Sequence, residues 1–323
     1  MELYPLKFEP VYQYRIWGGN KLKTVLKKNI SEESIGESWE ISDVEGNQTR
    51  VINGPLAGKT LRQLIATYKD ELVGSSVYNS FKHEFPLLIK FIDAKLPLSV
   101  QVHPDNELAR LRHNSFGKNE MWYIMQADKD AEIIVGFDKK IDREAYKSAV
   151  SKGDLINLLH IEKTAEGDTF YIPTGRVHAI GAGVLLAEIQ QTSDITYRIF
   201  DYNRIDAKTG KSRDLHTEEA VDAIDFEVAE SYKTDYQLLE NKQNRLVISP
   251  YFKTNILQIS KSYKPDYKEL DSFIIYICVK GQFELQYGNG SINCKIGETV
   301  LVPACLKEIV LISDQATLLE VSL

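Results

Sequence analysis

Short segments in which apolar and polar residues alternate follow one another along most of this chain, separated by glycine, asparagine and aspartate turns. Alternation with a period of two places successive side chains on opposite faces of a β-strand. The clearest segments are 98–102, 122–125, 132–135, 169–172, 184–190, 195–200, 255–259, 273–279 and 283–287. Many short strands in one chain are typical of a β-sandwich or a β-barrel.

Helical periodicity is confined to three segments. Apolar residues recur at helical spacing over 60–69, over 142–159 with a break near Gly153, and over 216–224. The sequence therefore predicts a mainly β protein with a few inserted helices.

A weak internal repeat suggests two similar β units. The segment Gly167-Asp-Thr-Phe-Tyr-Ile-Pro173 aligns without a gap with Gly297-Glu-Thr-Val-Leu-Val-Pro303. In the second copy Glu308 stands where His178 stands in the first, and no histidine follows His216. With a polar connection over 229–245, this predicts an N-terminal catalytic domain with helical insertions over 1–226. A degenerate C-terminal domain without metal ligands is predicted over 227–323.

Side chains that could bind a metal come from two stretches of the first unit. Gln101 and His103 lie two residues apart on a predicted strand, so their side chains share one face. Glu120 opens a later strand, and the sequence Gly-x5-Pro-x-Gly-x2-His that starts at Gly167 ends at His178 after a tight turn. Two imidazoles, a carboxylate and an amide oxygen form the donor set of an open catalytic site. These donors do not distinguish zinc from manganese, iron or cobalt.

Composition and charge bear on the partner of the protein, on membrane spans and on its cellular compartment. A formal charge of −7 and the lack of a basic run argue against a nucleic-acid partner. No window approaches ~18 apolar residues, so no membrane span is expected. The N-terminus lacks the pattern of a secretory signal, and the odd number of cysteines suggests reduced, buried thiols. We therefore expect a cytoplasmic protein.

The metal-binding residues lie within longer blocks of sequence. These are Arg15-Ile-Trp-Gly-Gly19, Gly36-Glu-Ser-Trp-Glu-Ile-Ser42, Leu98-Ser-Val-Gln-Val-His-Pro104 and Glu188-Ile-Gln-Gln-Thr-Ser-Asp-Ile-Thr-Tyr-Arg-Ile-Phe-Asp201. Together with the motifs Gln-x-His, Lys-x-Glu and Gly-x5-Pro-x-Gly-x2-His, they resemble the type I phosphomannose isomerases. The blocks extend from Arg15 to about His216. Because the large helical insertion of longer members is absent, the chain is similar to the short bacterial form.

The resemblance implies two cupin-type (jelly-roll) β-barrels with a few inserted helices. It also implies one zinc ion per chain, held by Gln101, His103, Glu120 and His178. The family interconverts mannose 6-phosphate and fructose 6-phosphate by moving a proton between C1 and C2 through an enediolate. This chemistry needs a proton carrier and a stabiliser of negative charge on oxygen. The implied partner is thus a small sugar phosphate, and no obligate protein partner is evident.

Three residues are candidates for catalysis. Arg198 matches the active-site arginine of the family, and its permanent charge suits a developing oxyanion. The alternative for Arg198 is an ion pair with Asp194 or Asp201, which its spacing allows. Lys118 matches the lysine before the ligand glutamate and is a candidate proton carrier, or else a solvated loop lysine. Glu188 is a second candidate base or an orienting group, and the sequence does not choose between the two proton carriers.

Substrate contacts are assigned to Trp17 and Ser99. The Trp17 ring could stack on the apolar face of a sugar or simply pack in the core. The candidates for binding the phosphate are Lys90, Lys95, Ser99 and Arg198.

Two other functions use the same donors. One is an iron-dependent cupin oxygenase, and the other is a non-enzymatic metal-binding cupin that recognises sugars. Gln101 as a fourth donor, with Lys118 and Arg198 nearby, favours an anionic polyol over the apolar substrate of an oxygenase. Retention of every donor in the first unit argues that its site is in use.

Overall fold

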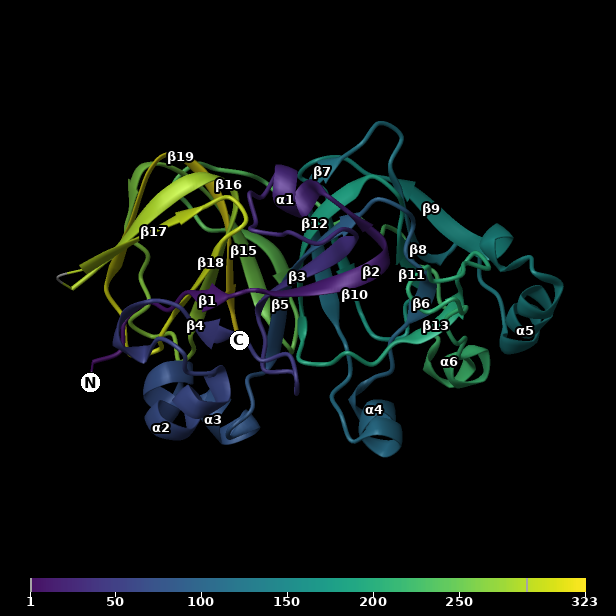
Figure 1. Cartoon of the computed structure of the whole chain (residues 1–323), viewed down its shortest axis with the longest axis horizontal. Coiled ribbons are helices and arrows are strands. Elements are labelled where there is room, and N and C mark those ends of the chain that lie inside the picture. The colour runs from purple at the N-terminus through teal and green to yellow at the C-terminus, as the bar shows by residue number, and fades with distance from the viewer. Residues whose placement is uncertain (1, 289) are drawn as a thin grey trace.

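The computed structural model describes residues 2–288 and 290–323 and consists mainly of β-strands, as the sequence predicted (Figure 1). Its first two-thirds form two sheets, which face each other across the site described below. The six-stranded sheet has the order β10 (Thr169–Ile172), β7 (Glu120–Ala127), β12 (Val184–Gln191), β5 (Leu87–Ala94), β2 (Val11–Gly19) and β3 (Ile35–Ile41).

The five-stranded sheet carries three of the candidate site residues. Its order is β13 (Tyr197–Phe200), β6 (Val100–Val102), β11 (His178–Ile180), β8 (Glu132–Phe137) and β9 (Leu159–Lys163). His178 and Arg198 lie opposite Gln101 on its two sides. Strand pairing thus brings together residues that are almost 100 positions apart in the sequence.

The last third of the chain forms a third sheet, drawn in green to yellow in Figure 1. Its strands are β14 (Asn244–Ile248), β15 (Lys253–Tyr263), β19 (Ile309–Ser322), β16 (Ile274–Tyr287) and β17 (Gly290–Lys295), with β18 (Thr299–Val302) also paired to β16. The two strands predicted over 273–279 and 283–287 are in fact the single strand β16. Register shifts flank Gly281, which has a φ of 74° and so bends β16 without ending it. A short separate pair joins β1 (Phe8–Glu9) to β4 (Arg50–Val51).

Helices connect and cover the sheets. They are α1 (Lys21–Thr24), α2 (Leu61–Val73), α3 (Ser75–Phe81), α4 (Asn106–His113), α5 (Arg143–Lys152) and α6 (Thr217–Ala223), with 3₁₀ turns η1 (Gly54–Leu56) and η2 (Leu155–Leu158). The three predicted helical segments are confirmed as α2, α5 and α6. Gly153 ends α5 in the left-handed conformation, which explains the predicted break. Among the described residues, no helix has both the length and the apolar character needed to cross a bilayer.

Helices α2 and α3 come from the first half of the chain but cover the third sheet (Figure 1). Thr60 and Gln63 form a capping box at the start of α2. At the start of α3, the Asp271 carboxylate accepts hydrogen bonds from the backbone N–H groups of Ser75 and Ser76, at 2.7 and 2.9 Å. The third sheet is therefore tied to the first half by helix capping as well as by packing.

The largest hydrophobic core is shared by both halves. The strands β5, β7 and β12 turn one face towards the third sheet, with Phe91, Tyr123 and Leu185 among the buried residues. Phe85 packs against Phe273 with ring centroids 4.7 Å apart. The division after residue 226 stays a prediction, because a common core spans the two sides of it.

The three cysteines form no disulfide among the described residues, in keeping with reduced thiols. Cys278 and Cys294 are buried, as predicted. Cys305 is exposed, because it lies in the turn that follows β18, so the expectation of three buried thiols was wrong for this residue.

Replacing Glu308 by alanine is expected to leave turnover unchanged and to alter the free energy of unfolding by less than about 0.5 kcal/mol. Glu308 stands at the position of His178 in the internal repeat, but its side chain is 78% exposed and lies 3.8 Å from Lys264. Steady-state kinetics and urea unfolding measure the two quantities. A well-folded Glu308→Ala variant with a large loss of turnover would contradict this expectation.

Candidate active site

A cavity of about 420 Å³ lies between the six-stranded and five-stranded sheets. Seven of the nine site residues predicted from the sequence line it: Trp17, Ser99, Gln101, Lys118, His178, Glu188 and Arg198. The other two, His103 and Glu120, are buried beside His178 in its wall. Lys90, one of the candidates for binding the phosphate, also lines it. Eight further charged or aromatic residues in the lining were not assigned to the site from the sequence: Tyr14, Arg15, Glu37, Trp39, Trp122, Asp194, Asp206 and Arg213.

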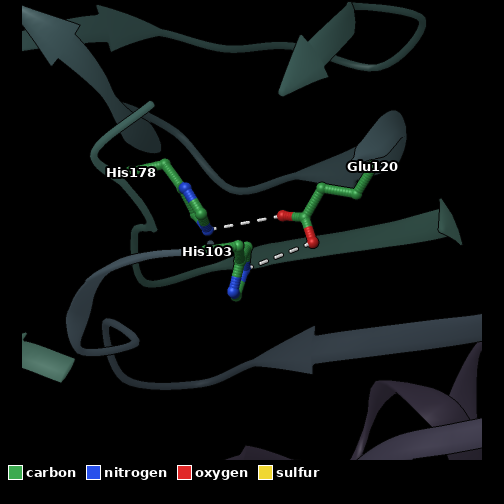
Figure 2. A group of neighbouring side chains, drawn as sticks. All are labelled: His103, Glu120 and His178. Carbon is green, nitrogen blue, oxygen red and sulfur yellow. Dashed lines mark ion pairs between the residues drawn. The ribbon is translucent and has the colours of Figure 1, made fainter. Parts of the chain in front are cut away.

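His103, Glu120 and His178 converge with their donor atoms facing one another (Figure 2). The Glu120 carboxylate lies between the imidazoles, with Oε1 3.4 Å from His178 Nε2 and Oε2 3.5 Å from His103 Nε2. One donor atom from each residue lies within 4.8 Å of the others. This grouping is compact enough for a single divalent ion.

Backbone contacts fix the orientation of both imidazoles. The Nδ1 atom of His103 lies 2.9 Å from the Ile195 carbonyl oxygen, and that of His178 lies 2.8 Å from the Arg176 carbonyl oxygen. Each Nδ1 therefore carries the proton, which leaves the Nε2 lone pair directed at the donor group. Burial lowers the pKa of His103 and lowers that of His178 to about 3, so both rings are neutral at pH 7. Neutral imidazole is the form that binds metals.

Gln101 adds an amide to the group. Its Nε2 lies 3.2 Å from His178 Nε2, across the β6–β11 strand pair. Turning the terminal amide over would direct its oxygen at the same point, and the two orientations have nearly the same shape. Glu120 Oε1 is buried and has no hydrogen-bond partner among the described residues. An orphaned carboxylate oxygen beside two neutral imidazoles costs free energy unless a cation satisfies it, so these residues fit a metal ion.

Lys118 brings a charged group to the donors. Its ammonium contacts Glu120 Oε2, lies 3.0 Å from His103 Nε2 and lies 3.8 Å from Glu188 Oε1. Lys118 lies just before β7, which begins at Glu120. The side chain is nevertheless buried in the site, so the alternative of a solvated loop lysine does not hold.

Glu188 is held by two partners on neighbouring strands of the same sheet. Lys90 on β5 lies 2.9 Å from its Oε1, and Trp122 Nε1 on β7 donates a hydrogen bond to its Oε2 at 2.9 Å. The strand register places the three residues in one cross-strand row. Burial alone would raise the pKa of Glu188, but Lys90 and then Lys118 outweigh burial and lower it. Glu188 is therefore ionised.

The pKa of Glu120 is shifted in the opposite direction from that of Glu188. Burial, followed by repulsion from Glu188, raises its pKa above the ordinary range of a glutamate. Two buried carboxylates thus share the cations Lys118 and Lys90. Such a pair is typical of catalytic sites, where environments push the pKa values of like groups apart.

Arg198 projects into the cavity from β13, and no carboxylate of the described residues pairs with it. Its Nη1 donates to the Asp214 carbonyl oxygen at 2.8 Å, and its Nε has no hydrogen-bond partner among the described residues. The alternative of an ion pair with Asp194 or Asp201 was wrong within the described part of the chain, because Asp201 pairs instead with Arg204 and Arg213. A desolvated guanidinium with a free N–H is suited to a ligand anion.

Trp17 and Ser99 are both buried and both line the cavity. Trp17 packs in the hydrophobic core between the two sheets as well, so both interpretations of this ring hold in part. Lys90, a candidate for binding the phosphate, is the one charged residue within the apolar run Leu-Leu-Ile-Lys-Phe-Ile of β5. A lysine in a strand buried on both faces requires a buried partner.

Replacing Glu37 by glutamine is expected to lower the free energy of unfolding by about 3 kcal/mol at pH 7. Although burial opposes ionisation, Arg15 and Lys90 lower the pKa of Glu37 from 4.5 to about 2. Because the pKa is lower in the folded state, the stabilisation is complete above pH 4.5 and is lost as the pH falls towards 2. Urea unfolding of both proteins across this pH range measures it.

The matched control is Glu227→Gln, which removes the exposed ion pair between Glu227 and Lys140, whose side chains are 68% and 70% exposed. This change should cost less than about 0.5 kcal/mol. Equal effects of the two substitutions would show that the Glu37–Arg15 pair stabilises the fold no more than a surface pair does.

Comparison with known proteins agrees with this geometry. The sequence matches the family model described as "Phosphomannose isomerase type I, catalytic domain" over residues 5–138 and that described as "Mannose-6-phosphate isomerase, cupin domain" over residues 242–321. It is 36% identical over 308 residues to a probable mannose-6-phosphate isomerase of Bacillus subtilis, covering 93% of this chain and 94% of that one. It is 35% identical over 304 residues to a mannose-6-phosphate isomerase of Streptococcus mutans, covering 94% and 93%.

The fold also agrees with a solved structure. The crystal structure of the mannose 6-phosphate isomerase from Bacillus subtilis superposes with a TM-score of 0.89 at 32% identity, covering 99% of this chain and 100% of that one. The predicted cupin fold is thereby confirmed, although its sheets are open at their edges rather than closed barrels. The chain is an enzyme of the type I phosphomannose isomerase family.

Proposed function

We propose that this enzyme interconverts mannose 6-phosphate and fructose 6-phosphate in the cytoplasm with one zinc ion per chain. His103, Glu120 and His178 would hold the ion, with Gln101 as a fourth donor. The proposal is supported by the donor geometry and by the relatives described as mannose-6-phosphate isomerases. When bound, the ion supplies a Lewis acid that favours negative charge on the sugar oxygens.

The transferred proton is assigned to the pair Lys118 and Glu188. The reaction moves a proton between C1 and C2 of the sugar through an enediolate, so a group beside these carbons must accept the proton and return it. The Lys118 ammonium and the ionised Glu188 carboxylate lie 3.8 Å apart in the cavity wall. Trp122 and Lys90 hold Glu188 from two sides, which fixes its position towards the sugar.

Arg198 is assigned to the developing negative charge on the sugar oxygens. It is unpaired by any carboxylate in the described part of the chain and lies opposite Gln101 on the neighbouring strand. Its charge is thus available next to the donor group. Trp17 and Ser99 would contact the sugar from the remaining cavity wall, Trp17 through its ring and Ser99 through its hydroxyl.

The observation that carries the proposal is the meeting of three groups in one cavity: the metal donor group, a carboxylate–lysine pair, and an arginine that no carboxylate of the described residues pairs with. A coupled spectrophotometric assay of mannose 6-phosphate conversion tests it. The zinc-loaded enzyme should turn over substrate, a chelator should abolish activity, and added zinc should restore it. Absence of conversion by folded, zinc-loaded protein would refute the proposal. Oxygen uptake with iron would then favour an oxygenase, and sugar binding without turnover would favour a binding protein.

A further inference from the structure

Asp201 holds two guanidinium groups at the edge of the cavity. Arg213 makes a bidentate pair with it, from Nε to Oδ2 at 2.8 Å and from Nη2 to Oδ1 at 2.5 Å. Arg204 also contacts Oδ1 and lies against the Tyr202 ring, 5.2 Å from its centroid. One carboxylate shared by two guanidiniums leaves an excess positive charge at this point.

Of these two arginines, only Arg213 belongs to the described lining of the cavity. It ends a hairpin of the loop between β13 and α6, closed by the bridge between Ile205 and Ser212. The opposite rim holds this hairpin, because the Tyr14 hydroxyl donates to Asp206 Oδ1 at 3.2 Å and the Lys208 ammonium lies 3.6 Å from the centroid of the Tyr14 ring. Because its Nε and Nη2 bind Asp201, Arg213 keeps Nη1, which has no hydrogen-bond partner among the described residues, for a ligand.

Asp201, Arg204 and Arg213, together called the Asp201 cluster, lie at the end of the cavity away from the metal donors. Arg204 Nη1 donates to the carbonyl oxygen of Pro97 at 2.6 Å, which places the cluster beside the segment that leads into β6. Ser99 follows on this segment, and Gln101 comes two residues later, a separation of about 6.6 Å along an extended chain. In an extended hexose, the phosphate on C6 is similarly remote from the reacting carbons C1 and C2. A sugar with C1 and C2 at the metal donors therefore extends towards Ser99 and Arg213.

The electrostatics of this end favour a doubly charged anion. Arg198 has no carboxylate partner among the described residues, and Arg213 shares its own with Arg204. Arg198 and Arg213 both line this cavity, so their two positive charges repel each other across it. A phosphate monoester carries a charge of about −1.5 to −2 at pH 7 and would relieve this repulsion. Planar guanidinium groups are the side chains best suited to phosphate oxygens.

We infer that Arg213, held in place by Asp201, binds the phosphate of the substrate and sets the preference of the enzyme for phosphorylated over free sugars. The inference rests on the proposed function, since it assigns a residue to one end of the same substrate. Ser99 supplies a hydroxyl at the same end of the cavity. Arg198 remains the charge beside the reacting carbons.

Replacing Arg213 by glutamine tests the assignment in the zinc-loaded enzyme. It should lower kcat/KM for mannose 6-phosphate by about 10- to 100-fold, the effect of one hydrogen-bonded charge, and mainly by raising KM. Inorganic phosphate should inhibit the variant correspondingly less, and titration calorimetry should show weaker binding of inorganic phosphate. The Arg213→Lys variant should recover part of the loss, because it restores the charge without the planar fork.

The matched control is Arg204→Gln, which removes a guanidinium from the same carboxylate but outside the cavity lining. This variant should lose much less affinity for inorganic phosphate than Arg213→Gln does, because Arg204 adds charge to the cluster but lies outside the described lining of the cavity. Equal phosphate affinity in wild type and Arg213→Gln, or a fall in kcat alone, would overturn the inference and leave Arg213 a support of the hairpin. Failure of the proposed function would give a different result, because the wild-type enzyme itself would then not convert mannose 6-phosphate. The titration with inorganic phosphate would still test whether Arg213 binds the anion.

Discussion

The His178→Ala variant should lose its bound zinc and at least about 100-fold in turnover. Even the loss of a group that only supports a metal ligand costs about 10- to 100-fold, and His178 itself supplies one of the donor atoms. Its Nε2 is directed at Glu120 by the contact of Nδ1 with the Arg176 carbonyl oxygen. Alanine would leave Glu120 and His103 without this third donor. Emission spectrometry of the purified protein measures zinc per chain, and the coupled assay measures turnover.

The control for this variant is His83→Ala, which removes an exposed imidazole whose ring contact is with Tyr78. It should retain full zinc content and full activity. Circular dichroism and the midpoint of thermal unfolding distinguish metal loss from general unfolding. A folded His178→Ala protein with normal zinc content would remove His178 from the set of metal ligands.

The Arg198→Ala variant is expected to fold and to keep its zinc, but to lose two to three orders of magnitude in kcat. Removal of one preorganised group that stabilises an oxyanion costs about 10²- to 10³-fold. Arg198 makes no ion pair within the described residues, so its loss leaves no carboxylate unpaired and should cost little stability. Steady-state kinetics and zinc analysis of the same preparation test both parts of the expectation.

A comparison with Arg198→Lys sharpens the result. Lysine keeps the charge but not the rigid fork, so it should recover part of the lost kcat. Unchanged kcat in Arg198→Ala would show that the residue serves only its contacts with Asp214 and His216. A parallel loss of zinc would instead mean that the side chain of Arg198 supports the donor group.

The donor set was predictable because each residue lies at a fixed place in a strand or turn. Alternation along the predicted strand put Gln101 and His103 on one face, although β6 itself ends at Val102, and the turn before β11 delivered His178. The helical segments predicted from apolar periodicity begin at Thr60 and Asp142, which are the N-caps of α2 and α5, and the predicted break at Gly153 is the C-cap of α5. Local patterns of this kind fix the direction of a side chain or the end of a helix from neighbouring residues alone.

Other features depended on contacts between distant segments. Lys90 could be ranked only as one of several candidates for the phosphate, because nothing along the sequence shows that β5 lies beside β12 and pairs it with Glu188. The bidentate pair of Arg213 with Asp201 likewise depends on how the loop after β13 folds back. Helix α3 was not predicted, because the residue that caps its N-terminus, Asp271, lies almost 200 residues later in the sequence.

The packing of the third sheet against the back of β5, β7 and β12 suggests why a unit without donors is kept. Residues of these strands alternate, so that Glu188 and Trp122 face the substrate while Leu185 and Tyr123 face the third sheet. A truncation that removed the last third would expose the apolar face of β5, β7 and β12 to water. It would also loosen the strands that position the reacting groups. The third sheet thus supports the strands of the site, and damage to it should cause poor expression and aggregation before any change in turnover.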